Sequence, residues 1–159
     1  MRILFVCLGN ICRSPTVEEV ARQLAAREAA QLGLQFDSAG TADYHIGAPP
    51  DVRSQRAALA RGYDLSGLRA RQLQPDDFRQ FDLLLAMDEA NLRDMQAVAP
   101  RGLAGRARLF LSYSRHGAAR PVPDPYYGGA AGFETVLDLA EHGCRDLFVA
   151  LAMVGAGRL

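Results

Sequence analysis

A cysteine and an arginine at a fixed spacing are the first candidates for chemistry in this chain. Residues 7–14 read C-L-G-N-I-C-R-S. Cysteine acts as a nucleophile in its thiolate form, which a helix N-terminus stabilises. Backbone N–H groups of a curled loop ahead of a helix form an anion cradle. Arg13 adds a planar fork that matches two oxygens of a phosphoryl group. The spacing predicts that Cys7 is a nucleophile and Arg13 an oxyanion clamp on one phosphate-binding loop.

The remaining residues of the loop fit the same interpretation. We expect Gly9 to allow a backbone conformation that other residues resist and Asn10 to hold the curl by side-chain hydrogen bonds. We expect Ser14 to donate a hydrogen bond to the thiolate. The alternative is a buried cysteine at a strand end, which is common and would be preferred for Cys7 alone. The whole combination, with Pro15 opening a helix, favours the catalytic interpretation.

A general acid must come from elsewhere in the chain. Thiolate attack on a phosphate monoester expels an alkoxide or phenoxide, so a proton donor is expected. Residues 123–127 read P-D-P-Y-Y and hold Asp124 in a stiff segment between two prolines. Tyr126 and Tyr127 supply flat faces that can wall a slot for an aromatic ring. A rigid surface turn with a solvated Asp124 is the alternative, and this segment alone would favour it. Together with the phosphate loop, Asp124 is the predicted acid.

Composition limits the classes of protein to consider. The 159 residues suit one domain, and 49% of them are apolar, enough for a substantial core. Basic and acidic residues balance at 18 each, so no broad nucleic-acid surface is expected. The chain contains no lysine, which excludes Schiff-base lysine chemistry and a P-loop nucleotide site.

The cysteines and the N-terminus predict a location. Three cysteines, Cys7, Cys12 and Cys144, are too few for a disulfide scaffold, and their odd number favours a reducing compartment. The only apolar run near the N-terminus is residues 3–7, too short for a signal peptide or a membrane span. We therefore expect a soluble, cytoplasmic protein.

The elements that position the loop follow from hydrophobic patterning. Short apolar runs predict strands at 2–7, 34–39, 82–87 and 107–111. Helical spacing predicts helices after Ser14 and Pro15, with Ser14 as the N-cap, at 51–61, and from a cap at Asp88 to Pro100. A last helix is predicted over 133–151, where the apolar residues form one stripe, and a long loop at 112–132. Alternating strands and helices predict a parallel sheet covered on both faces. Ligands bind such sheets beyond the carboxyl ends of the strands, and Cys7 ends the first.

Metal sites do not fit the pattern. Cys7 and Cys12 form C-x4-C, but Cys144 stands alone, and three histidines are scattered rather than paired. They are His45, His116 and His142, and we expect each to be a surface or structural residue rather than a ligand. We expect no metal and no cofactor.

The chain resembles the low-molecular-weight protein tyrosine phosphatase family. The resemblance is carried by C-L-G-N-I-C-R-S-P at 7–15 and D-P-Y-Y at 124–127, supported by D-S-A-G-T at 37–41 and M-D-E-A-N-L at 87–92. It covers nearly the whole chain and implies one α/β domain over 1–159, with a four-stranded parallel twisted sheet and helices on both faces. It also implies the catalytic roles of nucleophile, transition-state clamp and general acid for Cys7, Arg13 and Asp124.

The resemblance extends to other residues around the loop. It implies hydrogen bonds from Asn10, Ser14 and Ser38 that maintain the loop, and a reversible disulfide between Cys12 and the nucleophile. The implied substrate-binding set is Leu8, Gly9, Asn10, Ile11, Cys12, Ser14, Tyr44, Tyr126 and Tyr127. Two positions depart from the pattern of the family. Many relatives carry a histidine three residues before Arg71, where this chain has Leu68, so the hydrogen bonds of that histidine are not expected here. Tyr44 stands where some relatives have tryptophan.

The predicted function is hydrolysis of phosphotyrosine in protein substrates, and of small aryl phosphates, through a cysteinyl-phosphate. The expected partners are phosphotyrosine proteins, with no nucleic acid and no membrane, and the chain is expected to be a monomer or weak dimer.

Two alternative functions are considered. Arsenate reductase chemistry needs further cysteines, and only Cys144 lies beyond the loop. A non-catalytic phosphotyrosine-binding module would not need the nucleophile, the clamp and the acid together.

Overall fold

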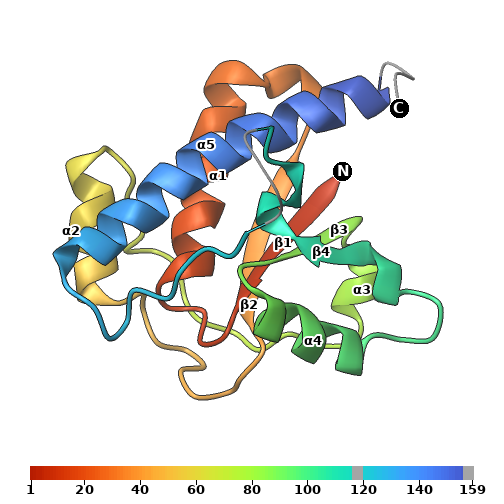
Figure 1. Cartoon of the computed structure of the whole chain (residues 1–159), viewed down its shortest axis with the longest axis horizontal. Helices are drawn as coiled ribbons and strands as arrows, with labels where there is room; N and C mark the ends of the chain where they lie inside the picture. Colours follow the sequence, from red (N-terminus) through yellow and green to blue (C-terminus); the bar gives the residue numbers. More distant parts are fainter. Residues whose placement is uncertain (116–119, 156–159) are drawn as a thin grey trace.

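The computed structural model describes residues 1–115 and 120–155, in which strands and helices alternate (Figure 1). The main elements, in chain order, are β1 (Arg2–Cys7), α1 (Arg13–Glu28), β2 (Gln35–Gly40), α2 (Val52–Ala60), α3 (Asp77–Gln80), β3 (Leu83–Ala86), α4 (Glu89–Val98), β4 (Ala107–Leu109) and α5 (Ala130–Gly155). Short 3₁₀ helices occupy Ala30–Leu32, Ala104–Arg106 and Phe110–Tyr113. His116, one of the scattered histidines, lies outside the described residues.

The four strands form one parallel sheet in the order β2-β1-β3-β4. β1 pairs with β2 in register from Arg2 opposite Gln35 to Cys7 opposite Gly40, and β3 pairs with its other edge. The chain therefore leaves β1 toward one side of the sheet and returns on the other. This reversal makes the carboxyl end of β1 the point at which α/β sheets bind ligands. The predicted α/β fold with a four-stranded parallel sheet is confirmed.

Both faces of the sheet are covered (Figure 1). Ile3, Phe5 and Cys7 of β1 belong to the apolar cluster under α1 and α5. The alternating residues Leu4 and Val6 belong to the cluster under α3 and α4. Since side chains alternate along a strand, burial on both faces explains why β1 is an unbroken apolar run.

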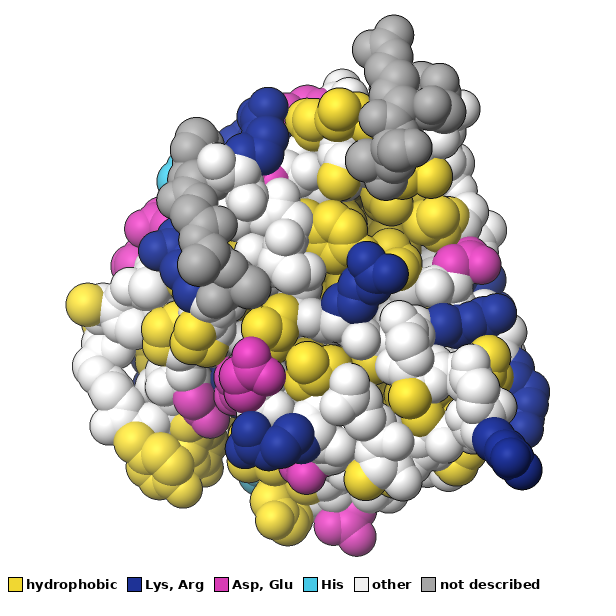
Figure 2. Space-filling view, turned by 45° about the vertical axis from the view of Figure 1, so that its right-hand side comes forward, with side chains coloured by type: hydrophobic (Ala, Val, Ile, Leu, Met, Phe, Trp, Pro, Cys, Tyr) yellow, Lys and Arg dark blue, Asp and Glu magenta, His cyan; other side chains and the backbone are white. Residues whose placement is uncertain are grey.

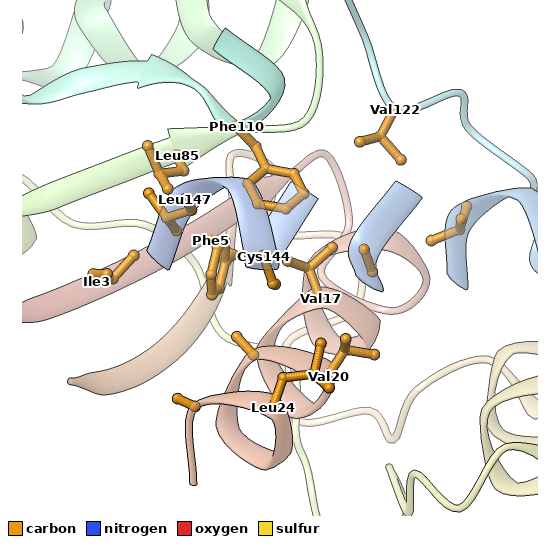
Figure 3. Packing of buried hydrophobic residues seen from close by; sticks show 14 of the residues in the cluster. Ile3, Phe5, Val17, Val20, Leu24, Leu85, Phe110, Val122, Cys144 and Leu147 are labelled. Carbon is orange, nitrogen blue, oxygen red and sulfur yellow. The ribbon is translucent and has the colours of Figure 1, made fainter. Parts of the chain in front are cut away.

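Helix α5 crosses α1 and packs against it with one apolar stripe. The predicted stripe residues are all buried: Phe133, Val136, Leu137, Ala140, Cys144, Leu147, Phe148 and Leu151. Glycine inside a helix costs about 1 kcal/mol relative to alanine. At Gly143, a Cβ would approach Phe110 Cζ to 2.6 Å, so the glycine permits the close packing of this ring. Figure 3 shows Phe110 beside Phe5 and Cys144, and the two phenyl rings meet edge to face at 5.6 Å.

Two local predictions are wrong, and one predicted helix cap is confirmed. Ser14 is not the N-cap of α1: Cys12 occupies that position without a side-chain cap, and the Ser14 hydroxyl contacts Cys7 instead. The fourth strand ends at Leu109 because the chain turns there into a 3₁₀ helix. Asp88 caps α4 by accepting from the Asn91 N–H. Asp51, the first residue of the predicted second helix, is the N-cap of α2.

Charges of both signs share the surface. Figure 2 shows basic and acidic side chains next to each other on one face. Arg61 pairs with three acidic residues of α5, Glu134, Asp138 and Glu141. Within the described residues, no helix is both long enough and apolar enough to cross a membrane.

Candidate active site

The loop between β1 and α1 encloses the sulfur of Cys7. The side chain is 3% exposed. Its Sγ lies 3.0 Å from Ser14 Oγ, and the backbone N–H of Asn10 donates to it over 3.3 Å. Both contacts come from groups that can donate a hydrogen to a sulfur anion. The Cys7 sulfur therefore has the Ser14 hydroxyl and a backbone N–H as hydrogen-bond partners.

Asn10 holds the curl of the loop. Its φ is +58°, in the left-handed region, where it is the only non-glycine among the described residues. The side-chain Nδ2 donates to Ser14 Oγ at 2.8 Å and to Ser38 Oγ at 3.0 Å, and Oδ1 accepts from the Arg71 N–H at 3.0 Å. These hydrogen bonds fix a conformation that costs energy in most residues. The expectation that Asn10 holds the loop through its side chain agrees with these contacts.

Two glycines near the loop leave room for neighbouring atoms that lie close to them, and neither adopts a positive φ. The prediction for Gly9 is wrong, because Asn10 takes the left-handed conformation and Gly9 does not. A Cβ on Gly9 would instead lie 2.9 Å from the His45 ring. Gly40, at the end of β2, passes closer still: a Cβ there would meet the Leu8 carbonyl oxygen at 2.7 Å. Small residues at these two positions let the loop fold against its neighbours.

Arg13 is buried at the start of α1 and anchored on one side. It is 3% exposed. Its Nη1 donates to Asp88 Oδ2 at 2.6 Å and to the Val122 carbonyl at 3.1 Å, while Nη2 lies 3.5 Å from Asp124 Oδ2. The same Asp88 caps α4 with its other oxygen. The sequence indicates Asp88 only as a helix cap. Its contact with Arg13, 75 positions away, depends on β3 lying beside β1.

Asp124 reaches the site on a segment anchored to the sheet. Val122 is fully buried, and its N–H donates to the Met87 carbonyl at the end of β3 over 2.7 Å. Asp124 Oδ1 accepts from the Tyr126 N–H at 3.0 Å, which closes a local turn. The carboxylate is 42% exposed and faces the Arg13 guanidinium.

One pocket of about 320 Å³ gathers most of the predicted site residues. It is lined by Cys7, Leu8, Gly9, Ile11, Cys12, Arg13, Tyr44, His45, Asp124, Tyr126 and Tyr127. Asn10 and Ser14, both predicted to bind substrate, are buried and do not line it. His45, which sequence analysis treated as a surface or structural residue, does line it. In the sequence, only its position next to Tyr44, a predicted pocket residue, indicated that His45 lies at the pocket.

The aromatic wall of the pocket is supported from α2. Tyr126 and Tyr127 meet edge to face with ring centroids 4.9 Å apart. The Arg53 guanidinium lies 5.4 Å from the Tyr126 ring and 4.9 Å from the Phe133 ring. Asp51 holds Arg53 through two side-chain hydrogen bonds. A cation over an aromatic face is attractive, so Arg53 ties Tyr126 to the start of α5.

The second cysteine of the loop differs from the first. Cys12 is 5% exposed, and burial raises the pKa of its thiol to about 12, outweighing a hydrogen bond with Ser54 that lowers it. Cys12 is therefore a neutral thiol at physiological pH. All three cysteines are free in this structure.

Leu68, which departs from many relatives, packs against the apolar cluster under α1 and α5. The Asn10 side chain nevertheless has partners on Ser14, Ser38 and Arg71. These hydrogen bonds hold the loop without a contribution from the side chain at position 68.

The fold and the pocket define the class: an α/β protein whose pocket, between its first strand and first helix, is lined by a cysteine and an arginine. The low molecular weight phosphotyrosine protein phosphatase model matches residues 2–155. A Synechocystis sp. relative named for the same activity is 47% identical over 154 residues, covering 95% of this chain and 96% of that protein. The human low molecular weight phosphotyrosine protein phosphatase is 41% identical over 90% of each chain.

Solved structures agree with these sequence matches. A protein tyrosine phosphatase from Entamoeba histolytica, with Hepes in its active site, superimposes with a TM-score of 0.90 at 34% identity, covering 100% of this chain and 99% of that one. This chain therefore belongs to the low-molecular-weight phosphotyrosine protein phosphatase family. It is accordingly a cysteine-dependent protein-tyrosine phosphatase.

Proposed function

We propose that Cys7, Arg13 and Asp124 carry the phosphatase reaction of this chain, on phosphotyrosine in proteins and on small aryl phosphates. The observation that supports this assignment best is that the three side chains line one pocket. The sulfur lies at the end of β1 and the guanidinium at the first residue of α1. The carboxylate comes from a separate segment of the chain, which Val122 anchors to Met87.

The first step forms a bond between sulfur and phosphorus. The phosphoryl oxygens bind the backbone N–H groups of the loop and the Arg13 guanidinium, which stabilise the charge that spreads over them in the transition state. The Cys7 thiolate attacks phosphorus in line with the ester oxygen. As the bond from phosphorus to that oxygen breaks, Asp124 gives its proton to the leaving phenolate.

The second step regenerates the enzyme. Asp124, now a carboxylate, takes a proton from a water molecule, whose oxygen attacks the phosphorus of the cysteinyl-phosphate. The bond between sulfur and phosphorus breaks, and Cys7 leaves as a thiolate. The products are the free phenol and inorganic phosphate. Every proton is handled by Asp124, so these steps need no metal or cofactor.

Selectivity for tyrosine follows from the walls of the pocket. The substrate ring lies between Tyr44 and the pair formed by Tyr126 and Tyr127, which offer flat apolar faces. Cys7 and Arg13 lie on the floor, each only 3% exposed. We therefore expect phosphotyrosine to place its phosphate on this floor, and the shorter side chain of phosphoserine not to reach it.

The predicted location and partners belong to this proposal as well. A thiolate nucleophile must stay reduced, which favours the cytoplasm. We expect phosphotyrosine proteins as partners, no nucleic acid and no membrane, and a monomer or weak dimer. Arsenate reduction is not favoured, because Cys144, the one cysteine beyond the loop, has an exposed fraction of 0% and cannot readily pass on a disulfide.

Replacing the acid tests the proposal through the leaving group. Asp124→Asn should slow hydrolysis of phosphotyrosine by roughly 10²- to 10⁴-fold, because the phenolate of tyrosine leaves poorly without a proton. Cleavage of p-nitrophenyl phosphate should slow less in a pre-steady-state assay of phenol release, since nitrophenolate is a good leaving group. Glu134→Gln, a change of an exposed carboxylate on α5, is the matched control. Equal slowing of both substrates would reject Asp124 as the acid.

A further inference from the structure

We propose that Arg53 is a positioning residue for the substrate ring: it holds the Tyr126 side chain in place relative to the phosphate-binding loop, and so sets the preference for phosphate esters that carry an aromatic ring. This inference rests on the proposed function, in which Tyr126 forms part of one wall of the slot for that ring. Arg53 lies on α2 and does not itself line the pocket. Nothing in the sequence pattern indicated a role for it.

The ring of Tyr126 has little support from its own segment. Asp124 fixes the backbone of Tyr126 by accepting from its N–H, but Tyr126 is 38% exposed. Its ring meets that of Tyr127 edge to face, and Tyr127 is itself 93% exposed. The two residues that follow, Gly128 and Gly129, have no side chains to pack on either ring. A wall with a fixed position therefore needs a contact from another element.

Arg53 supplies this contact from α2. Its guanidinium carbon lies 5.4 Å from the centroid of the Tyr126 ring and 4.9 Å from that of Phe133. Phe133 belongs to α5 and is 4% exposed. Figure 1 shows α2 beside the first turns of α5, and the two helices are in contact. Because a cation attracts an aromatic face, Arg53 holds the exposed ring of Tyr126 against a buried ring of α5.

Asp51 connects Arg53 to the phosphate-binding loop. Its carboxylate accepts from Arg53 Nε at 3.1 Å and from Arg53 Nη2 at 2.9 Å, a two-point contact with the guanidinium. These hydrogen bonds lower the pKa of Asp51, so the carboxylate is ionised at neutral pH. The backbone N–H of Asp51 donates to the Ile11 carbonyl of the loop at 2.8 Å. Asp51 and Arg53 thus link the loop that takes the phosphate to the ring that takes the aryl group.

This link makes the spacing between loop and wall a part of recognition. A substrate must bring phosphorus in line with Cys7 while its ring lies against Tyr126. If the wall is already in place, no binding energy is lost in ordering it. The loop does not depend on the guanidinium, because its contact with α2 is made by the backbone of Asp51. Loss of Arg53 should therefore weaken only ligands that carry a ring.

The test compares two phosphonates that differ in the ring. Benzylphosphonate and methylphosphonate are assayed as competitive inhibitors of p-nitrophenyl phosphate hydrolysis at one pH. In Arg53→Met, the inhibition constant of benzylphosphonate should rise by about three- to tenfold, the equivalent of one contact between a cation and an aromatic face. That of methylphosphonate should stay within about twofold of wild type. Arg53→Lys, which keeps the cation but loses the fork toward Asp51, should give an intermediate value for benzylphosphonate.

Arg56→Met is the matched control. Arg56 is exposed on the same helix and does not line the pocket, so both inhibition constants should keep their wild-type values. A second control places Arg53→Met in a Tyr126→Leu background, where it should cause no further loss, because the ring that it supports is gone. Thermal unfolding checks that each variant is folded, and Arg53→Gln replaces Arg53→Met if the latter does not fold.

The failure of this proposal can be told from a failure of the proposed function. An unchanged inhibition constant for benzylphosphonate in Arg53→Met, or an equal rise for both phosphonates, overturns the role of Arg53 and leaves the phosphatase reaction as proposed. A further loss in the double variant overturns it as well, since Arg53 would then act through something other than Tyr126. If the wild type binds benzylphosphonate no more tightly than methylphosphonate, the slot for the ring is itself wrong, and this proposal falls with it.

Discussion

Replacing Cys7 with serine should abolish hydrolysis of phosphotyrosine and of p-nitrophenyl phosphate, with a loss of roughly 10⁴-fold or more. A serine hydroxyl is almost entirely un-ionised at neutral pH, and in this loop it finds hydrogen-bond donors placed for an anion. The loop N–H groups and Arg13 remain, so the variant should still bind inorganic phosphate. Steady-state kinetics and phosphate-dependent thermal stabilisation measure the two properties separately.

Cys12→Ser is the matched control for this substitution. Cys12 lies in the same loop and lines the same pocket, but the raised pKa of its thiol, about 12, keeps it protonated. Its replacement should retain activity to within about tenfold. The reverse pattern, an inactive Cys12→Ser beside an active Cys7→Ser, would show that the nucleophile has been assigned to the wrong sulfur.

Arg13→Lys should lower kcat/KM by about 10³-fold, although the positive charge is kept. The guanidinium spans a carboxylate on Asp88 and a carbonyl on Val122 with Nη1 while Nη2 faces the Asp124 side of the pocket. A lysine ammonium is a point charge on a flexible stem and cannot supply this fork. Because the transition state gains most from the fork, kcat should fall further than KM rises.

The control for this change is Arg145→Lys. Arg145 is an exposed residue of α5 whose fork binds Glu28. A surface ion pair contributes little to stability, so this variant should keep wild-type kinetics. Near-normal activity in Arg13→Lys would reject the two-point binding of the phosphoryl group.

Much of the fold was predictable because its patterns are local. The first strand is an uninterrupted run of apolar residues, which indicates burial on both faces. The buried residues of α5 recur at helical spacing, which indicates a helix with one buried face. Asp88 could be predicted to cap α4, since a cap acts within one turn. The fourth strand was overextended, because the turn after Leu109 into a 3₁₀ helix depends on contacts outside the segment.

The parts of the site that were missed depend on tertiary contacts. Asp88 meets Arg13 only because β3 lies beside β1. The residue of the loop with left-handed backbone is Asn10 rather than Gly9. Hydrogen bonds of the Asn10 side chain with Ser14, Ser38 and the Arg71 N–H hold this conformation. Spacing alone does not carry such information.

The central claim is that the phosphoryl group passes through the sulfur of Cys7. The most direct measurement mixes Asp124→Asn with p-nitrophenyl phosphate, quenches the reaction with acid and locates bound phosphate by mass spectrometry. Nitrophenolate leaves without help, while the second step lacks its base, so the intermediate should accumulate. We expect a phosphoryl group on Cys7, formed at the rate of the first burst of nitrophenol. Turnover without phosphate on Cys7, or phosphate on another residue, would contradict it.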